Sequence, residues 1–199
     1  MFSYIVKRFI IPLCRDSGQV ILQALFAAFG EEGGFCRWVE RLGRQATLAA
    51  PTQRGGWAGA LLLYLQAVLL FESHRKAEFR NAADRARRDG ALIALELGDP
   101  EWMRRRGGPH AAYELAGIRP DILFASGAAA AELGVPLEGV ASIPVIRLDS
   151  GGCSVHGVRV FSPATDHDGD ALAATFCVAF VEGAAPVEAA GRAVLVAAL

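Results

Sequence analysis

The sequence is poor in lysine and has no cluster of positive charge at either end, which excludes one large class of partner. Of its 199 residues, 20 are basic, and just two of these are lysines, Lys7 and Lys76. The 21 acidic residues bring the formal net charge to −1. Proteins that bind nucleic acid through a basic surface carry a clear positive excess. We therefore expect no nucleic-acid partner.

Cysteine motifs and long uncharged segments are also lacking. No C-x-x-C pair and no histidine at zinc-ligand spacing occurs among the four cysteines, at positions 14, 36, 153 and 177. Such scattered cysteines are typical of small buried apolar residues in a reducing compartment. The longest uncharged run, 55–71, is short for a membrane helix and begins with two glycines, so we interpret it as a buried strand with its flanks. The apolar start, 1–12, has no signal-peptide cleavage site. These features predict a cytoplasmic protein without a membrane partner.

What the sequence does have is enough apolar residues, 53%, for the core of one domain over 1–199. Apolar runs alternate with helical patterns after residue 60. We predict strands at 61–70, 91–97, 121–125 and 143–148, and helices at 72–89, 109–117 and 128–133. This alternation indicates βαβ crossovers and a parallel sheet. A hairpin around Gly157 and two helices, 171–182 and 187–199, follow. The predicted fold class is α/β, with a mostly parallel sheet flanked by helices.

Two segments are harder to assign. Residues 35–42 alternate apolar with charged side chains like a strand, and after the turn-like 31–34 they suggest a β-hairpin. The run 104–106, three arginines near Trp102, is of a kind that contacts phosphate groups, but a solvated loop face is the commoner role for so short a run.

The segment 163–176 carries the best candidate for chemistry. Gly169 and Asp170 begin a helix, whose free backbone N–H groups and dipole favour a bound anion. An aspartate in that first turn can act as a general base beside a phosphate. The structural alternative is a helix cap, a role for which Asp and Gly are favoured. Asp168 and Asp170 are too few to form an oxygen-ligand metal site by themselves, so we predict no metal-ligand set.

This loop and helix resemble the C-terminal signature of the PfkB (ribokinase-like) carbohydrate kinases, in which Gly-Ala-Gly-Asp begins a long helix of small residues. Here that motif is matched by His167, Asp168, Gly169 and Asp170. The flanking sequences are similar as well, at 87–97, 119–125, 144–148, 152–157 and 180–183. The resemblance is strong over 57–199 and weak over 1–56.

The resemblance implies transfer of the γ-phosphoryl group of ATP to a hydroxyl of a sugar or nucleoside. Asp170 would take the proton of that hydroxyl, and Gly169, Asp168 and His167 would surround the phosphate. Mg²⁺ would bridge phosphate oxygens. The nucleotide would lie over the loop that contains Ser150, Gly151 and Gly152. ATP and Mg²⁺ are thus the implied cofactors, a small-molecule sugar or nucleoside the implied partner, and a homodimer the implied assembly.

The sequence departs from the family pattern at several of these positions. His167 and Asp168 replace a glycine and an alanine, which places a carboxylate where an anion should bind. The family's Asn-x-x-Glu pattern is matched by Ser126 and Ala129, so both of its polar residues are absent. Glu96 stands where aspartate is common, and Asp149 replaces a glycine. The family's opening strand and its Gly-Gly sugar-binding segment have no counterpart, which predicts an exposed sheet edge and truncation at both ends.

Losing preorganised electrostatic groups lowers a rate by roughly a hundred- to a thousandfold each. We therefore expect an ATP-dependent sugar kinase with weakened activity. Two alternatives stay open: a catalytically inactive homologue that binds nucleotide or sugar, and a gene remnant without a stable fold.

Overall fold

The computed structural model describes residues 21–25, 34–48, 60–71, 75–149, 151–162 and 168–198. Within these ranges the strands form one eight-stranded sheet in the order β2-β1-β3-β4-β5-β6-β7-β8. The strands are β1 (Ile21–Leu25), β2 (Gln45–Leu48), β3 (Ala60–Gln66), β4 (Leu92–Glu96), β5 (Ile122–Ser126), β6 (Ile143–Arg147), β7 (Cys153–Val155) and β8 (Val158–Val160). Neighbours from β2 to β6 are parallel, and β7 and β8 are antiparallel. The predicted α/β class and mostly parallel sheet are confirmed.

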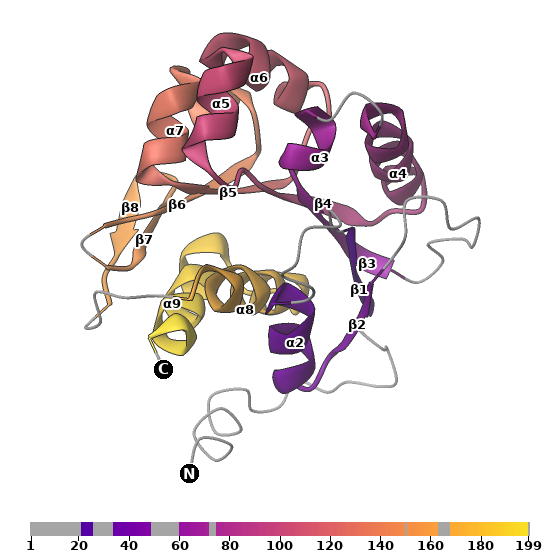
Figure 1. Cartoon of the computed structure of the whole chain (residues 1–199). Helices are drawn as coiled ribbons and strands as arrows, with labels where there is room; N and C mark the ends of the chain where they lie inside the picture. The colour runs from indigo at the N-terminus through magenta and orange to yellow at the C-terminus, as the bar shows by residue number, and fades with distance from the viewer. Residues whose placement is uncertain are drawn as a thin grey trace.

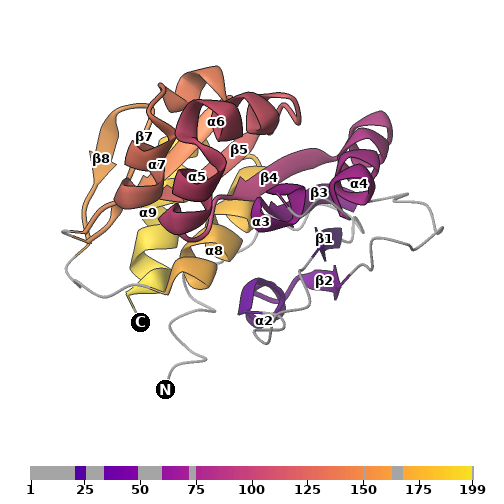
Figure 2. The ribbon, with the colours of Figure 1, turned by 45° about the horizontal axis from the view of Figure 1, so that its top comes forward.

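Helices cover both faces of this sheet (Figure 1). One face carries α2 (Gly34–Arg41), α8 (Gly169–Val181) and α9 (Pro186–Ala197). The other carries α3 (Val68–Phe71), α4 (Lys76–Arg88), α5 (Pro100–Arg106), α6 (Gly108–Ala116) and α7 (Gly127–Leu133), with a 3₁₀ turn at Leu137–Gly139 before β6. The turned view shows the same two layers (Figure 2). Among the described residues, no helix is long and apolar enough to cross a membrane.

The core has two halves, one on each face, because the central strands are buried on both sides. This explains why β3 and β5 are almost continuously apolar rather than alternating. A chain of aromatic rings ties the α2–α8 face together. Phe35 stacks on Tyr64 with 3.9 Å between ring centroids, and Phe124 meets Phe176 edge-on at 5.5 Å. Burial, the largest effect, raises the pKa of Tyr64 well above its ordinary value.

Helix α8 lies between α9, α2 and the sheet, and every residue from 171 to 179 is buried. A helix that is buried all round must be apolar all round, and small residues let its neighbours approach closely. Alanine at four of these nine positions satisfies both needs. The packing therefore fixes the start of α8, which matters for the candidate site.

The interpretation of 35–42 as a strand is wrong, because these residues form most of α2. Phe35, Val39 and Leu42 are buried and Trp38 is half-buried, which is the spacing of one helical face. Over so few positions, the pattern of apolar and charged residues fits the period of a strand and that of a helix equally well. Packing against α8 favours the helix, because it buries one helical face. The hairpin suggested for this region is therefore absent between β1 and β2, which instead pair in parallel.

The sequence predicts an exposed sheet edge without naming a strand, and β3 is not that edge, because β1 pairs with β3 and β2 pairs with β1. Of the described strands, β2 is the one that ends the sheet on this side.

The run 104–106 belongs to helix α5 rather than to a loop. Asp99 caps this helix by accepting a hydrogen bond from the Glu101 N–H at 2.8 Å, and Pro100 occupies its first turn. Gly107, with φ of 81°, follows its end. The three arginines are paired with carboxylates of Glu101, Glu132 and Glu114. The loop interpretation is therefore wrong, whereas the solvated face is confirmed for Arg104 and Arg105, whose side chains are 59% and 68% exposed.

Other predictions hold with shifted ends. The predicted strand 61–70 is β3 followed by α3, and the hairpin is β7 and β8, joined by His156 and Gly157 with φ of 50° and 77°. Positive φ at both central residues suits a type I′ turn. Cys153 and Cys177 are free and buried, as expected. Burial raises the pKa of the Cys153 thiol to about 11.

A buried carboxylate on α6 gives the fold a pH dependence. Glu114 is 3% exposed and accepts hydrogen bonds from Arg106 at 2.9 Å and from Lys76 on α4. The hydrogen bonds of Arg106, the largest cause, and those of Lys76 outweigh burial and lower the pKa of Glu114 from 4.5 to about 2.

Because the folded pKa is depressed, this contribution to stability is complete above about pH 4.5 and is lost as the pH falls toward 2. We expect Glu114→Gln to lower the free energy of unfolding at pH 7 by about 2 kcal/mol and to cost much less at pH 3. Urea unfolding at both pH values measures this difference. The matched control is Glu101→Gln on exposed α5, which should change stability by less than about 1 kcal/mol. An equal cost of Glu114→Gln at both pH values would refute the assignment.

Candidate functional site

The candidate site lies at the carboxyl edge of the parallel strands, where open α/β sheets usually bind ligands. Strand β4 ends at Glu96, β5 at Ser126 and β6 at Arg147. Helix α8 begins beside them, since Gly169 lies against the Arg147 guanidinium. The order of the strands thus brings together groups that are far apart in the sequence.

Glu96 and Arg147 form a two-bond ion pair across β5. Arg147 Nη1 donates to Glu96 Oε2 at 2.9 Å, and Nη2 donates to Oε1 at 2.8 Å. Their side chains are 12% and 23% exposed, so the pair is largely shielded from water. Burial lowers the pKa of Arg147, but the hydrogen bonds and negative charge of Glu96 outweigh it and the pKa is raised. The guanidinium is therefore a fixed positive charge under the start of α8.

The backbone N–H groups at the start of α8 are already bonded to a side chain of the protein. Asp168 is the N-cap residue, and its Oδ1 accepts from the N–H groups of Asp170 at 2.9 Å and Ala171 at 3.1 Å. Its other oxygen accepts from the indole N–H of Trp38 on α2 at 2.8 Å. A carboxylate thus stands where the sequence predicts a bound anion. Asp168 caps the helix, which is the structural alternative that the sequence suggests for this helix start.

Asp170 lies one position into α8, with its side chain half-buried against the first residue of α2. A Cβ atom at Gly34 would overlap a carboxylate oxygen of Asp170. Glycine at this position is what allows α2 to approach the carboxylate so closely. The structure therefore brings together Asp168, Gly169 and Asp170, with Gly34, Trp38 and Arg147 around them.

The described glycines of the β6–β7 loop, Gly151 and Gly152, form the turn of that loop. The Gly151 N–H donates to the Leu148 carbonyl at 3.0 Å, and the Gly152 carbonyl accepts from the Leu148 N–H at 3.1 Å. Both glycines have positive φ, and a Cβ at Gly152 would overlap the Val160 carbonyl oxygen. Their conformation is explained by this turn. The other two predicted binding residues, Ser150 and His167, lie outside the described residues.

Three residues of the site were not predicted from the sequence: Arg147, Trp38 and Gly34. Arg147 is a charged residue at the end of an apolar strand, and that position was a usable signal. Trp38 was hidden by the strand interpretation of 35–42. Gly34 gave no signal, because its importance comes from an approach between α2 and α8.

The described residues do not form a ligand set for Mg²⁺. Glu96 is bound by Arg147, and Asp168 accepts three hydrogen bonds. Over the described ranges, no group of three or more His, Cys, Asp or Glu side chains is placed to hold a metal ion. Ser126, where the resembled family has asparagine, caps α7 through the Ala129 N–H at 3.1 Å. No step is therefore assigned to a metal held by these residues.

Comparisons with known proteins identify the class of fold. No family model matches the chain, and no curated protein sequence does so either. Solved structures do match. Adenosine kinase from Sinorhizobium meliloti is similar with a TM-score of 0.61 and 23% identity, over 69% of this chain and 48% of that one. A PfkB protein from Polaromonas sp. JS666 has a TM-score of 0.65 and 15% identity, and the match covers 90% of this chain and 95% of that one. A carbohydrate kinase from Agrobacterium tumefaciens has a TM-score of 0.59 and 13% identity, and the match covers 90% of each chain.

At these identities the likeness shows the fold, which is that of the ribokinase-like sugar and nucleoside kinases. The chain spans about half the length of the adenosine kinase, 48%. The predicted ribokinase-like fold is thus confirmed, and activity has to be argued from the site.

Proposed function

We propose that this chain is a PfkB-type phosphotransferase that moves the γ-phosphoryl group of ATP to a hydroxyl of a sugar or nucleoside, with weakened turnover. The observation that carries the proposal is the start of α8. It places Asp170 and the helix N-terminus at the carboxyl edge of the sheet, with the Arg147 guanidinium beneath Gly169. The proposal takes 1–199 as one domain. A cytoplasmic location and a homodimer stay predictions.

In the proposed reaction, the carboxylate of Asp170 accepts the proton of the substrate hydroxyl. The resulting oxygen forms a bond to the γ-phosphorus as the bond from that phosphorus to the β-γ bridging oxygen breaks, and ADP leaves. In the proposed reaction, the N–H groups of Asp170 and Ala171, which now bond to Asp168 Oδ1, hold the charge that gathers on the transferred group, and Arg147 adds a fixed positive charge.

The same contacts explain why turnover should be weak. The Asp168 carboxylate must release the Asp170 and Ala171 N–H groups before a phosphate oxygen can reach them. A carboxylate left beside the phosphate also repels it. Both effects act on the bound nucleotide and on the transition state, so the loss is expected in kcat/KM for ATP.

A second candidate is a catalytically inactive homologue that binds nucleotide or sugar. It is favoured by the cap at Asp168 together with the Glu96–Arg147 pair, because both carboxylates are then already bound by groups of the protein itself.

The two candidates differ in the effect of Asp170→Asn. Under the proposal, the wild type converts ATP to ADP when Mg²⁺ and one member of a panel of sugars and nucleosides are present. Asp170→Asn lowers that rate at least a hundredfold, because the proton acceptor is lost while the size is kept. A coupled assay of ADP release measures both. Each chain must first show cooperative thermal unfolding, which the gene-remnant alternative excludes. Equal rates in two folded chains would overturn the kinase and leave the binding homologue.

A further inference from the structure

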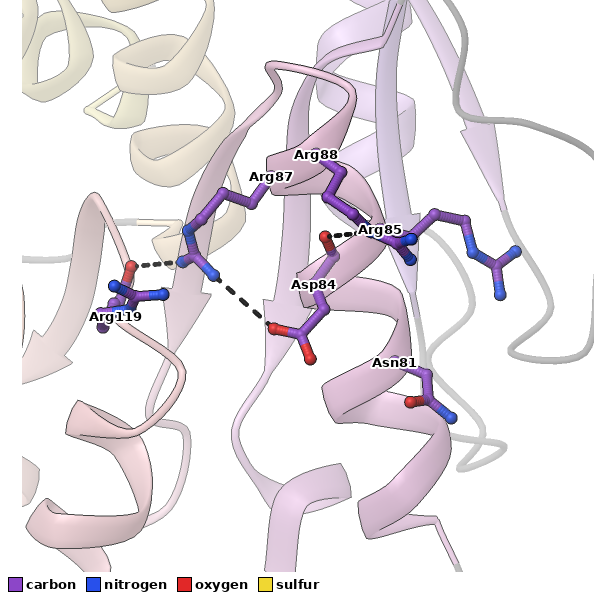
Figure 3. A pocket seen from close by; sticks show the side chains of 6 residues that line it. All are labelled: Asn81, Asp84, Arg85, Arg87, Arg88 and Arg119. Atoms are coloured by element: carbon purple, nitrogen blue, oxygen red, sulfur yellow. Dashed lines mark hydrogen bonds and ion pairs between the residues drawn. The ribbon is translucent and has the colours of Figure 1, made fainter.

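A basic cavity lies at the opposite edge of the sheet from the candidate site. It has a volume of about 600 Å³, and six described residues line it: Asn81, Asp84, Arg85, Arg87, Arg88 and Arg119 (Figure 3). Five of them belong to α4, four of these to its C-terminal half, which ends shortly before β4; Arg119 lies shortly before β5. The cavity therefore lies at the amino edge of these parallel strands, whereas α8 begins at their carboxyl edge.

The charge of the lining is strongly one-sided. Four arginines face one aspartate, which leaves an excess of three positive charges among the described lining residues. Arg85, Arg87 and Arg88 lie in the last turn of α4, where cations also suit the helix dipole. The dipole of α4 does not explain Arg119, which comes from a different segment and faces α4 across the cavity (Figure 3).

The backbone at Arg119 is held in an uncommon conformation. Its φ is 52°, a left-handed value that glycine adopts readily and a large side chain rarely does. Arg87 fixes the corner by donating from Nη2 to the carbonyl oxygens of Ile118 at 2.6 Å and Arg119 at 2.7 Å. Arg87 is thus a positioning residue. A position that favours glycine carries an exposed guanidinium instead.

We propose that this cavity binds a soluble small molecule through a di- or polyphosphate group, with Arg119 and Arg88 as its direct contacts. Guanidinium groups match phosphate oxygens in charge and geometry. The volume is that of a small-molecule site rather than of a single phosphate. The described lining holds no aromatic ring on which a nucleotide base could stack, so recognition acts on the phosphates. This site is independent of the proposed kinase function.

Titration calorimetry of the full chain with pyrophosphate at constant ionic strength tests the proposal. We expect saturable binding that Arg119→Gly weakens at least tenfold and Arg88→Gln several-fold. Arg119→Gly keeps the thermal midpoint or raises it, because glycine suits the backbone there, so a loss of binding cannot come from unfolding. The matched control is Arg192→Gln, an exposed arginine of α9 that is paired with Glu188 and lies off the cavity.

Pyrophosphate bound at the start of α8 should not respond to Arg119→Gly or Arg88→Gln, which separates this cavity from that site. The proposal is overturned by no saturable binding, or by equal weakening in Arg119→Gly and Arg192→Gln, which would indicate net charge alone. It is also overturned if a single-stranded oligonucleotide binds through the same arginines and pyrophosphate does not displace it.

Discussion

Replacing Asp168 by alanine should raise the rate of ADP release at least tenfold, although it removes a helix cap. The variant frees the N–H groups of Asp170 and Ala171 and takes a negative charge away from the place where the phosphate binds. Relief of about 1.4–2.7 kcal/mol of repulsion and competition corresponds to roughly a tenfold to a hundredfold gain in kcat/KM for ATP. Loss of the cap should lower the free energy of unfolding by about 1 kcal/mol. Activity and stability should therefore change in opposite directions.

Asp99→Ala is the matched control for this prediction. Asp99 caps α5, at the same edge of the sheet, by accepting from the Glu101 N–H at 2.8 Å. Its removal costs a similar cap and the same charge, but it frees no N–H group of α8. We expect a comparable loss of stability without a gain in turnover. A gain of the same size in both variants would mean that net charge near the site, rather than the occupied helix start, limits the rate.

The largest expected effect on stability is at the Glu96–Arg147 pair. Glu96→Leu leaves the Arg147 guanidinium largely buried without its carboxylate, and we expect the free energy of unfolding to fall by about 3 kcal/mol. Chemical denaturation at pH 7 measures the change.

The double variant Glu96→Leu with Arg147→Met distinguishes the loss of the ion pair from the effect of an unpaired buried charge. It replaces both charges with apolar groups and should recover most of the loss, because an unpaired buried charge costs more than a missing ion pair. A double variant that costs the sum of the two single ones would show that the groups do not interact in the folded protein.

Much of the sheet could be predicted from the sequence because its signals are local. Strands β4, β5 and β6 are short apolar runs between turn residues, and α4 shows a buried face of Phe79, Ala82, Ala83 and Ala86 at helical spacing. Helix α5 was missed although its signal is also local. No helix is predicted from the sequence between the strand 91–97 and residue 109, whereas Asp99 and Pro100 are the cap and first turn of α5.

The arrangement of the site depends on contacts that no local pattern contains. Glu96 and Arg147 are 51 residues apart, and they meet because β4, β5 and β6 lie side by side in register. Trp38 reaches Asp168 because α2 packs on α8. The sequence did indicate a carboxylate where an anion should bind, but the bonds of that carboxylate to the helix start follow from the geometry of the cap.

The central claim is that Asp168 occupies the anion position at the start of α8. It is tested most directly by the Kd for ATP, measured by calorimetry in the presence of Mg²⁺ for the wild type and Asp168→Ala. We predict that the variant binds ATP at least tenfold more tightly than the wild type, while Asp99→Ala binds as the wild type does. Equal affinity in the wild type and a folded Asp168→Ala variant would contradict the claim.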